Sequence, residues 1–562
     1  MYIERVKKKA GEKTHVQVLM RHSYRDKGRV RKRTVCNLTH FPPKQVQAIE
    51  WALQHPDEVE TAMALGGGEL KVREGKSIGA VWAVAEVARR LGIAKALGSQ
   101  RQGQLALWQV IARVLEQGSR LSAVRLHEFY ALAEAVGLKQ GFDEDDLYDN
   151  LAWLSQHQAA IEDELFKARR KKGAAPPALF LYDVTSSYLE GQCNALGDYG
   201  YNRDGKRGKK QIVVGLLCEE TGEPVSVEVF GGSTPDMKTL GSQVQKTAER
   251  FGCEKVTFVG DRGMIKKANK EELNEASFSY ITALTKQQIE SLLNHGSLQM
   301  ELFDTAVCEV NLDGRRLVLR RNPVRAQEMA AGRESKRAAI QALADQQTAY
   351  LQDHPRARTE TALKRVQAKI DTLRVTGWLR VSAEGRVLRL HTDEAALEAE
   401  SRLDGCYVLE TDVPEDAASA ETIHSRYKDL TLVENAFRTC KDVIPEKAGT
   451  GHLELRPIYV RNEASTRGHV FVVMLAYLIR RELQRAWAHL NLTVEEGVRN
   501  LNTLCVMELH IAQDAKIQKI PTPRPQSQTL LKALGVTLPS YIPTAELRVA
   551  TKKKLPQNRK TP

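Results

Sequence analysis

The sequence predicts an α/β fold in which a mixed β-sheet flanked by helices is interrupted by an insertion domain and preceded by a basic β-hairpin and a helical domain. Short apolar runs have the length of buried strands, and two of them end in an aspartate. Strand patterns alternate with a helical pattern at residues 238–252, which is typical of a mixed sheet with a crossover helix. The strand-like runs of the expected sheet are residues 178–183, 211–218, 223–230, 255–261 and 405–411.

The chain before this sheet has two parts. Residues 14–37 read as two basic strands joined by turn residues at 25–28, and the glycines at 66–68 mark a break. Such a hairpin is either a ribbon that lies along DNA or a charged edge that keeps the protein soluble. Helical patterns follow, and the acidic start at 142–146 suits a helix N-terminus. We expect these helices at residues 78–91, 102–116, 122–136 and from 142 onward.

A long interruption separates the first four strands from the last one. Strand-like runs at 305–312 and 315–320 lead into a helical region at 325–374, which is broken at His354 and Pro355. A strand-like run at 385–390 closes it. The helical region is expected either to form part of an insertion domain or to serve as an antiparallel hairpin for dimerisation.

Charge is concentrated at the two ends of the chain. The formal net charge is +13 over 562 residues, of which residues 1–33 contribute +9 and residues 546–562 contribute +5. A near-neutral body with basic ends fits a protein that binds a polyanion, although soluble proteins also carry basic tails.

The remaining composition points to an intracellular protein. The eight cysteines are scattered, with no C-x-x-C pair and no zinc-type spacing, which favours a reducing compartment. Basic residues from Arg5 onward argue against a signal peptide, and the longest apolar run, 470–479, is about half a membrane span. We therefore expect a cytoplasmic protein with no membrane association.

Three acids carry the expected chemistry. Asp183 and Asp261 each end an apolar strand, where a carboxylate is costly to bury unless it is paired or binds a cation. Either aspartate alone is better explained by a turn or a helix cap. Together with Glu434 on a helix, however, they suit a phosphoryl-transfer site in which carboxylates hold Mg²⁺ around a scissile phosphate.

Residues 427–441 read as one amphipathic helix. Tyr427, Glu434, Arg438 and Lys441 fall, with Leu430, on one face about 80° wide. Such a stripe is either a solvated surface or the wall of a site.

These residues resemble a known family. The pattern Tyr427-x2-Leu430-x3-Glu434-x6-Lys441 resembles the Y-x2-R-x3-E-x6-K motif of DDE transposases from bacterial insertion sequences, the group named after insertion sequence number four, and its sixteen-thirty-four branch most closely. Asp183-Val-Thr-Ser and Gly260-Asp-Arg-Gly are similar to the group's two aspartate motifs. Further similar stretches are residues 200–205, 211–216 and 231–240.

The resemblance implies an RNase H-like sheet, with the insertion lying between the second aspartate and the glutamate. The resemblance runs from about residue 1 to about residue 510, and the domain order begins with a basic β-rich region. Beyond residue 520 the sequence is Pro-rich and basic, which predicts a disordered tail. The expected boundaries are 1–70 for the β-rich region, 76–170 for a helical DNA-binding domain, 175–290 and 401–510 for the catalytic core, 291–400 for the insertion and 511–562 for the tail.

The implied activity is metal-dependent DNA cleavage at the ends of an insertion sequence, followed by strand transfer into target DNA. Asp183, Asp261 and Glu434 would hold two Mg²⁺ ions, for which Mn²⁺ is an expected substitute. The partners would be double-stranded DNA with terminal inverted repeats and target DNA, bound by a dimer in a nucleoid-associated bacterial protein. The expected DNA contacts are Tyr427, Arg438, Lys441 and Arg262, with the basic loop residues Lys206, Arg207, Lys209 and Lys210.

Two alternatives share these residues. One is an RNase H-like nuclease without strand transfer, and the other is a non-catalytic DNA-binding derivative of a transposase. A nucleotide-binding ATPase is excluded by the lack of a G-x4-G-K-[ST] run.

One motif position differs from the family, because the arginine of the motif is Leu430 here. We expect Arg438, one turn past Glu434, to supply the missing phosphate contact. On this hypothesis a Leu430→Arg substitution would partly replace Arg438.

Overall fold

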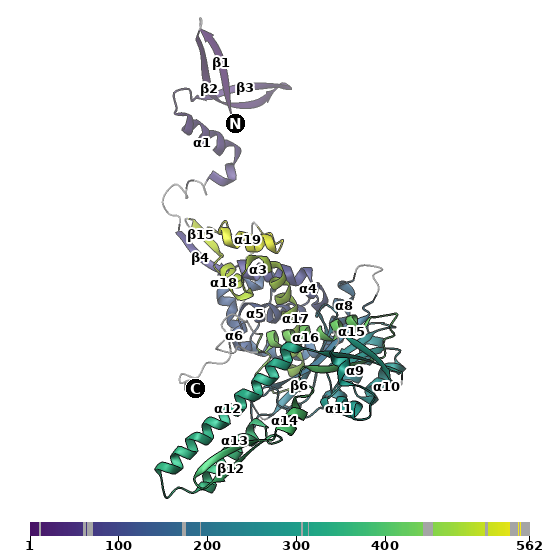
Figure 1. Cartoon of the computed structure of the whole chain (residues 1–562). Coiled ribbons are helices and arrows are strands. Elements are labelled where there is room, and N and C mark those ends of the chain that lie inside the picture. Colours follow the sequence, from purple (N-terminus) through teal and green to yellow (C-terminus); the bar gives the residue numbers. More distant parts are fainter. Residues whose placement is uncertain are drawn as a thin grey trace. The chain divides into compact units, whose positions relative to one another are not determined.

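The computed structural model forms two compact units (Figure 1). The first unit comprises Met1–Ala83, His127–Ala135 and Val498–Glu546, and the second comprises Val84–Leu126, Val136–Gly497 and Leu547–Pro562. The glycine run at 66–68 and residues 552–562 lie outside the described residues. The residues that the structure describes are 1–10, 13–59, 63, 71–170, 176–191, 193–304, 307–312, 314–441, 453–511, 515–539, 549 and 551.

The first unit begins with a three-stranded antiparallel sheet, in the order β1 (Tyr2–Ala10), β2 (Lys13–Asp26) and β3 (Arg29–Asn37). The expected hairpin is confirmed, and β1 adds a third strand to it. Lys27 and Gly28 form the tight turn with positive φ angles, which glycine adopts without steric cost. Helix α1 (Pro43–Gln54) and a short 3₁₀ turn (Pro56–Glu58) follow this sheet.

A second sheet of the first unit brings together distant parts of the chain. Strand β15 (Cys505–Ile511) lies between β4 (Lys71–Ser77) and β16 (Ala515–Lys519), with antiparallel pairing on both sides. Helix α19 (Pro525–Ala533) follows and buries Leu530.

This sheet corrects the expectation of a disordered tail from residue 511. A Pro-rich run predicts disorder, but here Pro525 occupies the first turn of α19. Proline is tolerated at that position because its missing N–H would have no helical partner. Strand β16 is held by its backbone pairing with β15, which its own short sequence does not reveal.

Helices dominate residues 79–168, as expected. The capping box between Asp143 and Asp146 starts α8 at the predicted acidic cluster. The expected helix at 122–136 is divided in two, because Tyr130 forms a β-bridge with Ser77. The helices are α3 (Gly79–Arg90), α4 (Ile93–Leu97), α5 (Arg101–Leu115), α6 (Arg120–Phe129), α7 (Leu132–Val136) and α8 (Glu144–Ala168).

The centre of the second unit is an eight-stranded mixed sheet in the order β10-β11-β14-β9-β8-β5-β6-β7. Strands β5, β8 and β9 run parallel, and the other neighbours pair antiparallel. The strands are β5 (Leu179–Tyr188), β6 (Gln211–Glu219), β7 (Pro224–Gly231), β8 (Thr257–Gly260), β9 (Ser279–Ala283), β10 (Cys308–Leu312), β11 (Arg315–Arg321) and β14 (Cys406–Thr411).

Helices cover both faces of this sheet. Apolar residues of α9 and α10 pack with Tyr182 and Phe258 on one face, whereas α16 lies against β5 and α17 against β7 on the other. Helix α17, which contains the apolar run 470–479, also packs against α5 and α8. These helices are α9 (Leu240–Glu249), α10 (Lys267–Glu275), α11 (Lys286–Asn294), α15 (Ala420–Lys428), α16 (Leu430–Cys440) and α17 (Glu463–Trp487). Helix α18 (Val494–Asn502) follows α17 in the chain.

The interruption of the sheet is smaller than expected. We assigned residues 305–312 and 315–320 to the insertion, but β10 and β11 join the main sheet through the pairing of β11 with β14. The two runs alone do not reveal this, since their partner β14 lies some distance further along the chain.

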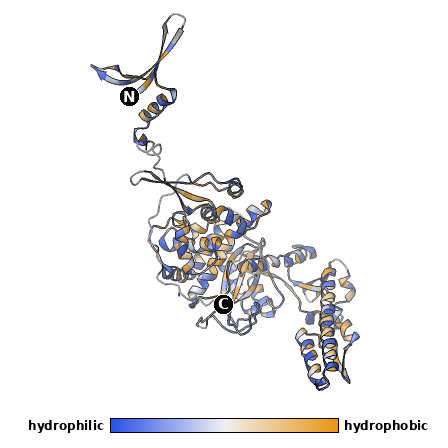
Figure 2. Ribbon diagram, turned by 90° about the vertical axis from the view of Figure 1, so that its left-hand side faces the viewer, coloured by the Kyte–Doolittle hydropathy of each residue, from blue (hydrophilic) through white to orange (hydrophobic). Residues whose placement is uncertain are grey.

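The segment between β11 and β14 forms a helical hairpin with a small sheet. Helix α12 (Pro323–Asp353) packs against α13 (Thr359–Leu373) around Ile340, Val366 and Trp378, and the break at His354 and Pro355 is confirmed. Strands β12 (Leu379–Glu384) and β13 (Val387–Thr392) and helix α14 (Glu394–Ser401) complete it. Hydrophobic and hydrophilic residues are interspersed along these helices (Figure 2).

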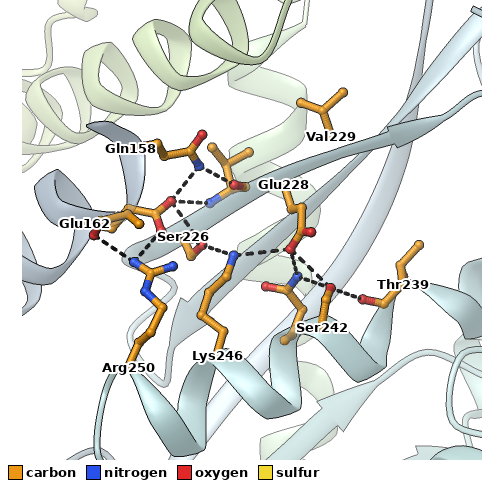
Figure 3. A network of polar contacts seen from close by, with 12 residues as sticks. Gln158, Glu162, Ser226, Glu228, Val229, Thr239, Ser242, Lys246 and Arg250 are labelled. Atoms are coloured by element: carbon orange, nitrogen blue, oxygen red, sulfur yellow. Dashed lines mark hydrogen bonds and ion pairs between the residues drawn. The ribbon is translucent and has the colours of Figure 1, made fainter. Parts of the chain in front are cut away.

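A polar network joins α8, β7 and α9 (Figure 3). Glu162 of α8 accepts hydrogen bonds from Gln158, from the Ser226 hydroxyl and from the Val227 N–H, and it pairs with Arg250, which caps the C-terminus of α9. Lys246 connects Ser226 to Glu228 at 2.7 and 3.2 Å. The network therefore fixes two helices to the same strand.

Within the part of the chain that is described, no helix has both the length and the apolar character needed to cross a membrane.

Candidate active site

Three carboxylates from distant segments meet at one end of the central strands. Asp183 follows Tyr182, which pairs with Gly260 in the parallel register of β5 and β8, so Asp183 and Asp261 occupy neighbouring strand positions. Glu434 lies on α16, which packs against β5. All three line a pocket of about 550 Å³. They also line a smaller adjoining one.

The two aspartates differ in a way that the sequence did not indicate. Strand β8 ends before Asp261 as expected, but β5 continues past Asp183 to Tyr188. It continues because β6 pairs with it along its whole length. Asp183 is therefore held within a strand, and Asp261 starts an exposed loop.

The electrostatics of Asp183 are unusual. Burial raises the pKa of Asp183 to about 7, the nearby carboxylates of Asp261 and Glu434 add to the shift, and Arg203 opposes it. A hydrogen bond from the Val184 N–H, at 2.8 Å, also favours the charged form. No ion pair to Asp183 occurs among the described residues, so the protein leaves much of this negative charge uncompensated.

The carboxylate oxygens of these acids are suitable ligands for a divalent cation, but the side chains are not arranged around a common metal position. Among the residues that the structure describes, no group of three or more His, Cys, Asp or Glu side chains is arranged to hold a metal ion. The Oδ1 of Asp261 instead accepts hydrogen bonds from the Arg262 N–H and the Tyr427 hydroxyl, at 2.7 and 3.1 Å. Three oxygen donors around an uncompensated charge are nevertheless what Mg²⁺ prefers.

The expected single helix at 427–441 is two helices. The chain turns at Asp429, so Tyr427 ends α15 and Leu430 begins α16. The turn lets the Tyr427 hydroxyl reach Asp261, and burial, with the nearby Asp261, raises the pKa of Tyr427. Leu430 is only 7% exposed. It is a packing residue at the pocket wall, and an arginine could not replace it without burying a charge.

The two cations of the motif have different surroundings. Arg438 is 76% exposed and lies 3.9 Å from Glu434, beside the three acids. Lys441 lies at the same pocket but is mostly buried, and its ammonium donates to Asp204 at 2.9 Å. Burial lowers the pKa of Lys441, although Asp204 opposes the shift. Arg262 is exposed and lines both pockets.

The basic loop lies between β5 and β6. Lys206, Arg207 and Lys209 are exposed, and Lys210 is half-buried. Lys209 pairs with Glu190 at 2.7 Å. The loop thus presents cations to solvent, although one of them already has an acidic partner.

The sequence analysis missed several residues at the site. Arg203 pairs with Asp236 at 2.6 Å, and both line the smaller pocket. Asp204, 1% exposed, binds Lys441 and Arg456. Arg203 and Asp204 lie within stretch 200–205, and Asp236 lies within stretch 231–240. The resemblance of these stretches to the family was the signal that could have assigned these residues to the site.

Other missed residues come from the opposite wall of the larger pocket. They include Asn322, Arg325 and Met329 at the start of α12, with Lys286 and Lys428. The position of α12 depends on long-range packing, so no local signal could have placed it at the acids. Lys428 stands next to Tyr427 and was open to inference.

Two family models match parts of this chain. Residues 174–444 match the family model described as a transposase DDE domain. Residues 3–61 match the model for the N-terminal domain of IS1634 family transposases. No curated protein matches the chain. A cryo-EM structure of a piggyBac transposase synaptic complex with hairpin DNA is similar at 9% identity, covering 71% of this chain and 69% of that one, but its TM-score of 0.35 is too low to support an argument.

Three acids at one pocket, within a matched DDE domain, define the class of protein: a DDE transposase, an enzyme that binds DNA, cleaves it and transfers the cut strand. Enzymes of this class use divalent metal ions. The two matched models, over residues 3–61 and 174–444, together identify the chain as a transposase of the IS1634 family.

Proposed function

We propose that Asp183, Asp261 and Glu434 are the catalytic residues of this transposase and hold two Mg²⁺ ions, with Mn²⁺ as a substitute. The observation that carries the proposal is the meeting of these three acids at one pocket, with Asp183 half-buried and much of its charge uncompensated. Such perturbed carboxylates cluster at functional sites because burial without a partner is costly. When bound, the cations would activate the attacking hydroxyl and stabilise the leaving 3′ oxygen.

The chain's own residues position the DNA and the acids. Tyr427 donates a hydrogen bond to Asp261 and so orients its carboxylate. Arg262 and Arg438 lie exposed at the pocket edges, where their guanidinium groups can bind the phosphates beside the cut. Lys441, held by Asp204, contributes a fixed positive charge at the same pocket.

The surrounding fold has the attributes of an RNase H-like core, namely a mixed sheet with the acids on neighbouring central strands and on a helix packed against it. The exposed Lys206, Arg207 and Lys209 and the half-buried Lys210 would bind duplex DNA outside the cut site, together with the helical domain and the basic β1–β3 sheet. Two element ends must be brought together, so we propose a dimer in the complex with terminal inverted repeats and target DNA.

The acids are tested by single Asp183→Asn, Asp261→Asn and Glu434→Gln variants. Each should lose cleavage of a duplex that carries the inverted repeats flanking the gene, while the affinity for that duplex stays near wild type. Cleavage by any one variant at near the wild-type rate would remove that residue from the site. Wild-type products that are cut but never joined would favour the nuclease alternative over strand transfer.

The N-terminal sheet is tested separately. Deletion of residues 1–33, which contribute a net charge of +9, should flatten the dependence of log K on log salt, since each phosphate contact contributes about −0.9 to that slope. An unchanged slope would show that the charge only keeps the protein soluble.

A further inference from the structure

A second hollow, of about 690 Å³, lies beside the catalytic pocket on the α10 and α11 side of the sheet. Four basic side chains line it: Lys266, Lys267, Lys270 and Arg315. Among its described lining residues Glu410 is the one acid. None of these residues belongs to the catalytic constellation, and the excess of positive charge calls for an anionic ligand.

Glu410 holds basic side chains in place, and its single negative charge does not neutralise the positive charge of the hollow. Its carboxylate, 2% exposed, accepts hydrogen bonds from Lys270 at 2.6 Å and from the Tyr280 hydroxyl at 3.0 Å. Arg315 lies 3.6 Å from the same carboxylate. Two cations are thereby fixed in place around one acid. Lys266 and Lys267 at the start of α10 are exposed and add two further positive charges.

The hollow adjoins the active site. Ala283 and Leu284, at the end of β9, line both the hollow and the catalytic pocket. The loop that begins at Asp261 leads directly to Lys266. Because each strand of a duplex carries one phosphate for about every 3.4 Å of helix axis, we expect DNA with one phosphate at the acids to bring further phosphates to these lysines.

The side chains that line the hollow favour contacts with the DNA phosphate backbone over contacts with the edges of the bases. Gln288, the amide side chain that could read a base edge, has its Oε1 committed to the N–H and hydroxyl of Thr285 at the start of α11. Lysine is a point charge that suits phosphate, and phosphate contacts carry no sequence information. Recognition of element ends requires base contacts, whereas capture of target DNA does not.

We propose that this hollow binds the phosphate backbone of target DNA during strand transfer. The inference rests on the transposase activity described above. It adds a second DNA path that reaches the catalytic acids from the α10 and α11 side.

The test is a Lys266→Gln/Lys267→Gln double variant of the full chain, assayed separately for cleavage of element ends and for joining of pre-cleaved ends to a plasmid. We expect joining to fall at least tenfold and cleavage to stay within twofold. The salt dependence of binding to a duplex without element ends should flatten by about 1.8 in log–log slope, from two lost contacts at about 0.9 each.

A matched control removes two lysines elsewhere. Lys364 and Lys369 are exposed on α13, and the Lys364→Gln/Lys369→Gln variant should leave both reactions unchanged. Equal losses of cleavage and joining by the first variant would assign the hollow to element-end DNA and overturn the proposal, as would unchanged joining. A wild-type enzyme that cannot join ends would instead overturn strand transfer itself.

Discussion

Two carboxylates of the second unit, the buried Glu162 and the half-buried Asp183, have opposite surroundings. Glu162, 1% exposed, accepts hydrogen bonds from two side chains and a backbone N–H and pairs with Arg250 (Figure 3). Asp183 accepts one from the Val184 N–H, and its pKa is raised to about 7 by burial. A satisfied acid stabilises the packing around it, whereas an unsatisfied one is retained at a cost. The contrast separates a structural acid from a functional one.

Asp204 is an intermediate case. It is as buried as Glu162 and is satisfied by Lys441, Arg456 and the Tyr188 N–H, yet it stands beside the catalytic pocket. Its partner Lys441 lines that pocket with the three acids. Asp204 therefore stabilises the fold through its ion pairs and also fixes Lys441 at the active site. Its loss should lower both stability and activity.

The largest expected effect is that of Asp183→Asn. Metal-held charge at a phosphoryl-transfer site supplies several kcal/mol of transition-state stabilisation, so cleavage should fall at least about a thousandfold. Because the amide is neutral, the melting temperature should stay the same or rise. Gel cleavage assays and a thermal melt measure both quantities, and a strongly lowered melting temperature would show that Asp183 is structural after all.

Glu162→Ala should show the reverse behaviour. Removing one partner of a buried pair costs about 3 kcal/mol of stability, while cleavage per folded molecule should change less than twofold. Denaturant unfolding and a cleavage assay normalised to folded protein provide the measurement. Glu164→Ala on the exposed side of α8 is the control, and it should leave stability unchanged within about 0.5 kcal/mol.

Asp204→Asn should lower both stability and activity. It removes the charge that holds Lys441 and Arg456, which should cost about 2 kcal/mol of stability. Cleavage should fall about tenfold, or about 1.4 kcal/mol, because Lys441 is no longer fixed at the pocket. A loss of stability with full activity would place Asp204 with Glu162 as a structural acid only.

The smallest effect concerns Arg438. Arg438→Ala should weaken cleavage about tenfold, which corresponds to about 1.4 kcal/mol, with little change in stability because the side chain is 76% exposed. In contrast with the expectation from the motif alone, Leu430→Arg should not restore activity. Its site is buried, and the added guanidinium should lower the melting temperature. Recovery of cleavage in the double variant would contradict this interpretation.

Much of the fold could be predicted because its signals are local. The strands β6, β7, β8 and β14 follow apolar runs, and the break between α12 and α13 follows a proline. The errors arose where partners are distant. The sequence pattern places β10 and β11 in the insertion, although β11 pairs with β14 of the main sheet. The composition predicts disorder where β16 and α19 form.

The features of the candidate site also fall into those that the local sequence predicts and those that depend on distant partners. The sequence by itself determined which acids to consider, since Asp183, Asp261 and Glu434 each stand in a recognisable pattern. It also determined that the ends of the chain are basic. It could not determine the turn at Asp429 that brings Tyr427 to Asp261, the burial of Leu430, or the pairing of Lys441 with Asp204.

Those features depend on tertiary structure for a physical reason. Residue type and spacing set the secondary structure, because backbone propensity and hydrophobic period act over a few residues. Burial and charge compensation depend on which segments meet, and residues 183, 204, 261 and 441 meet only once the sheet has formed and α16 packs on β5. Only the folded chain decides that Asp204 finds its cations within the protein whereas much of the Asp183 charge stays uncompensated.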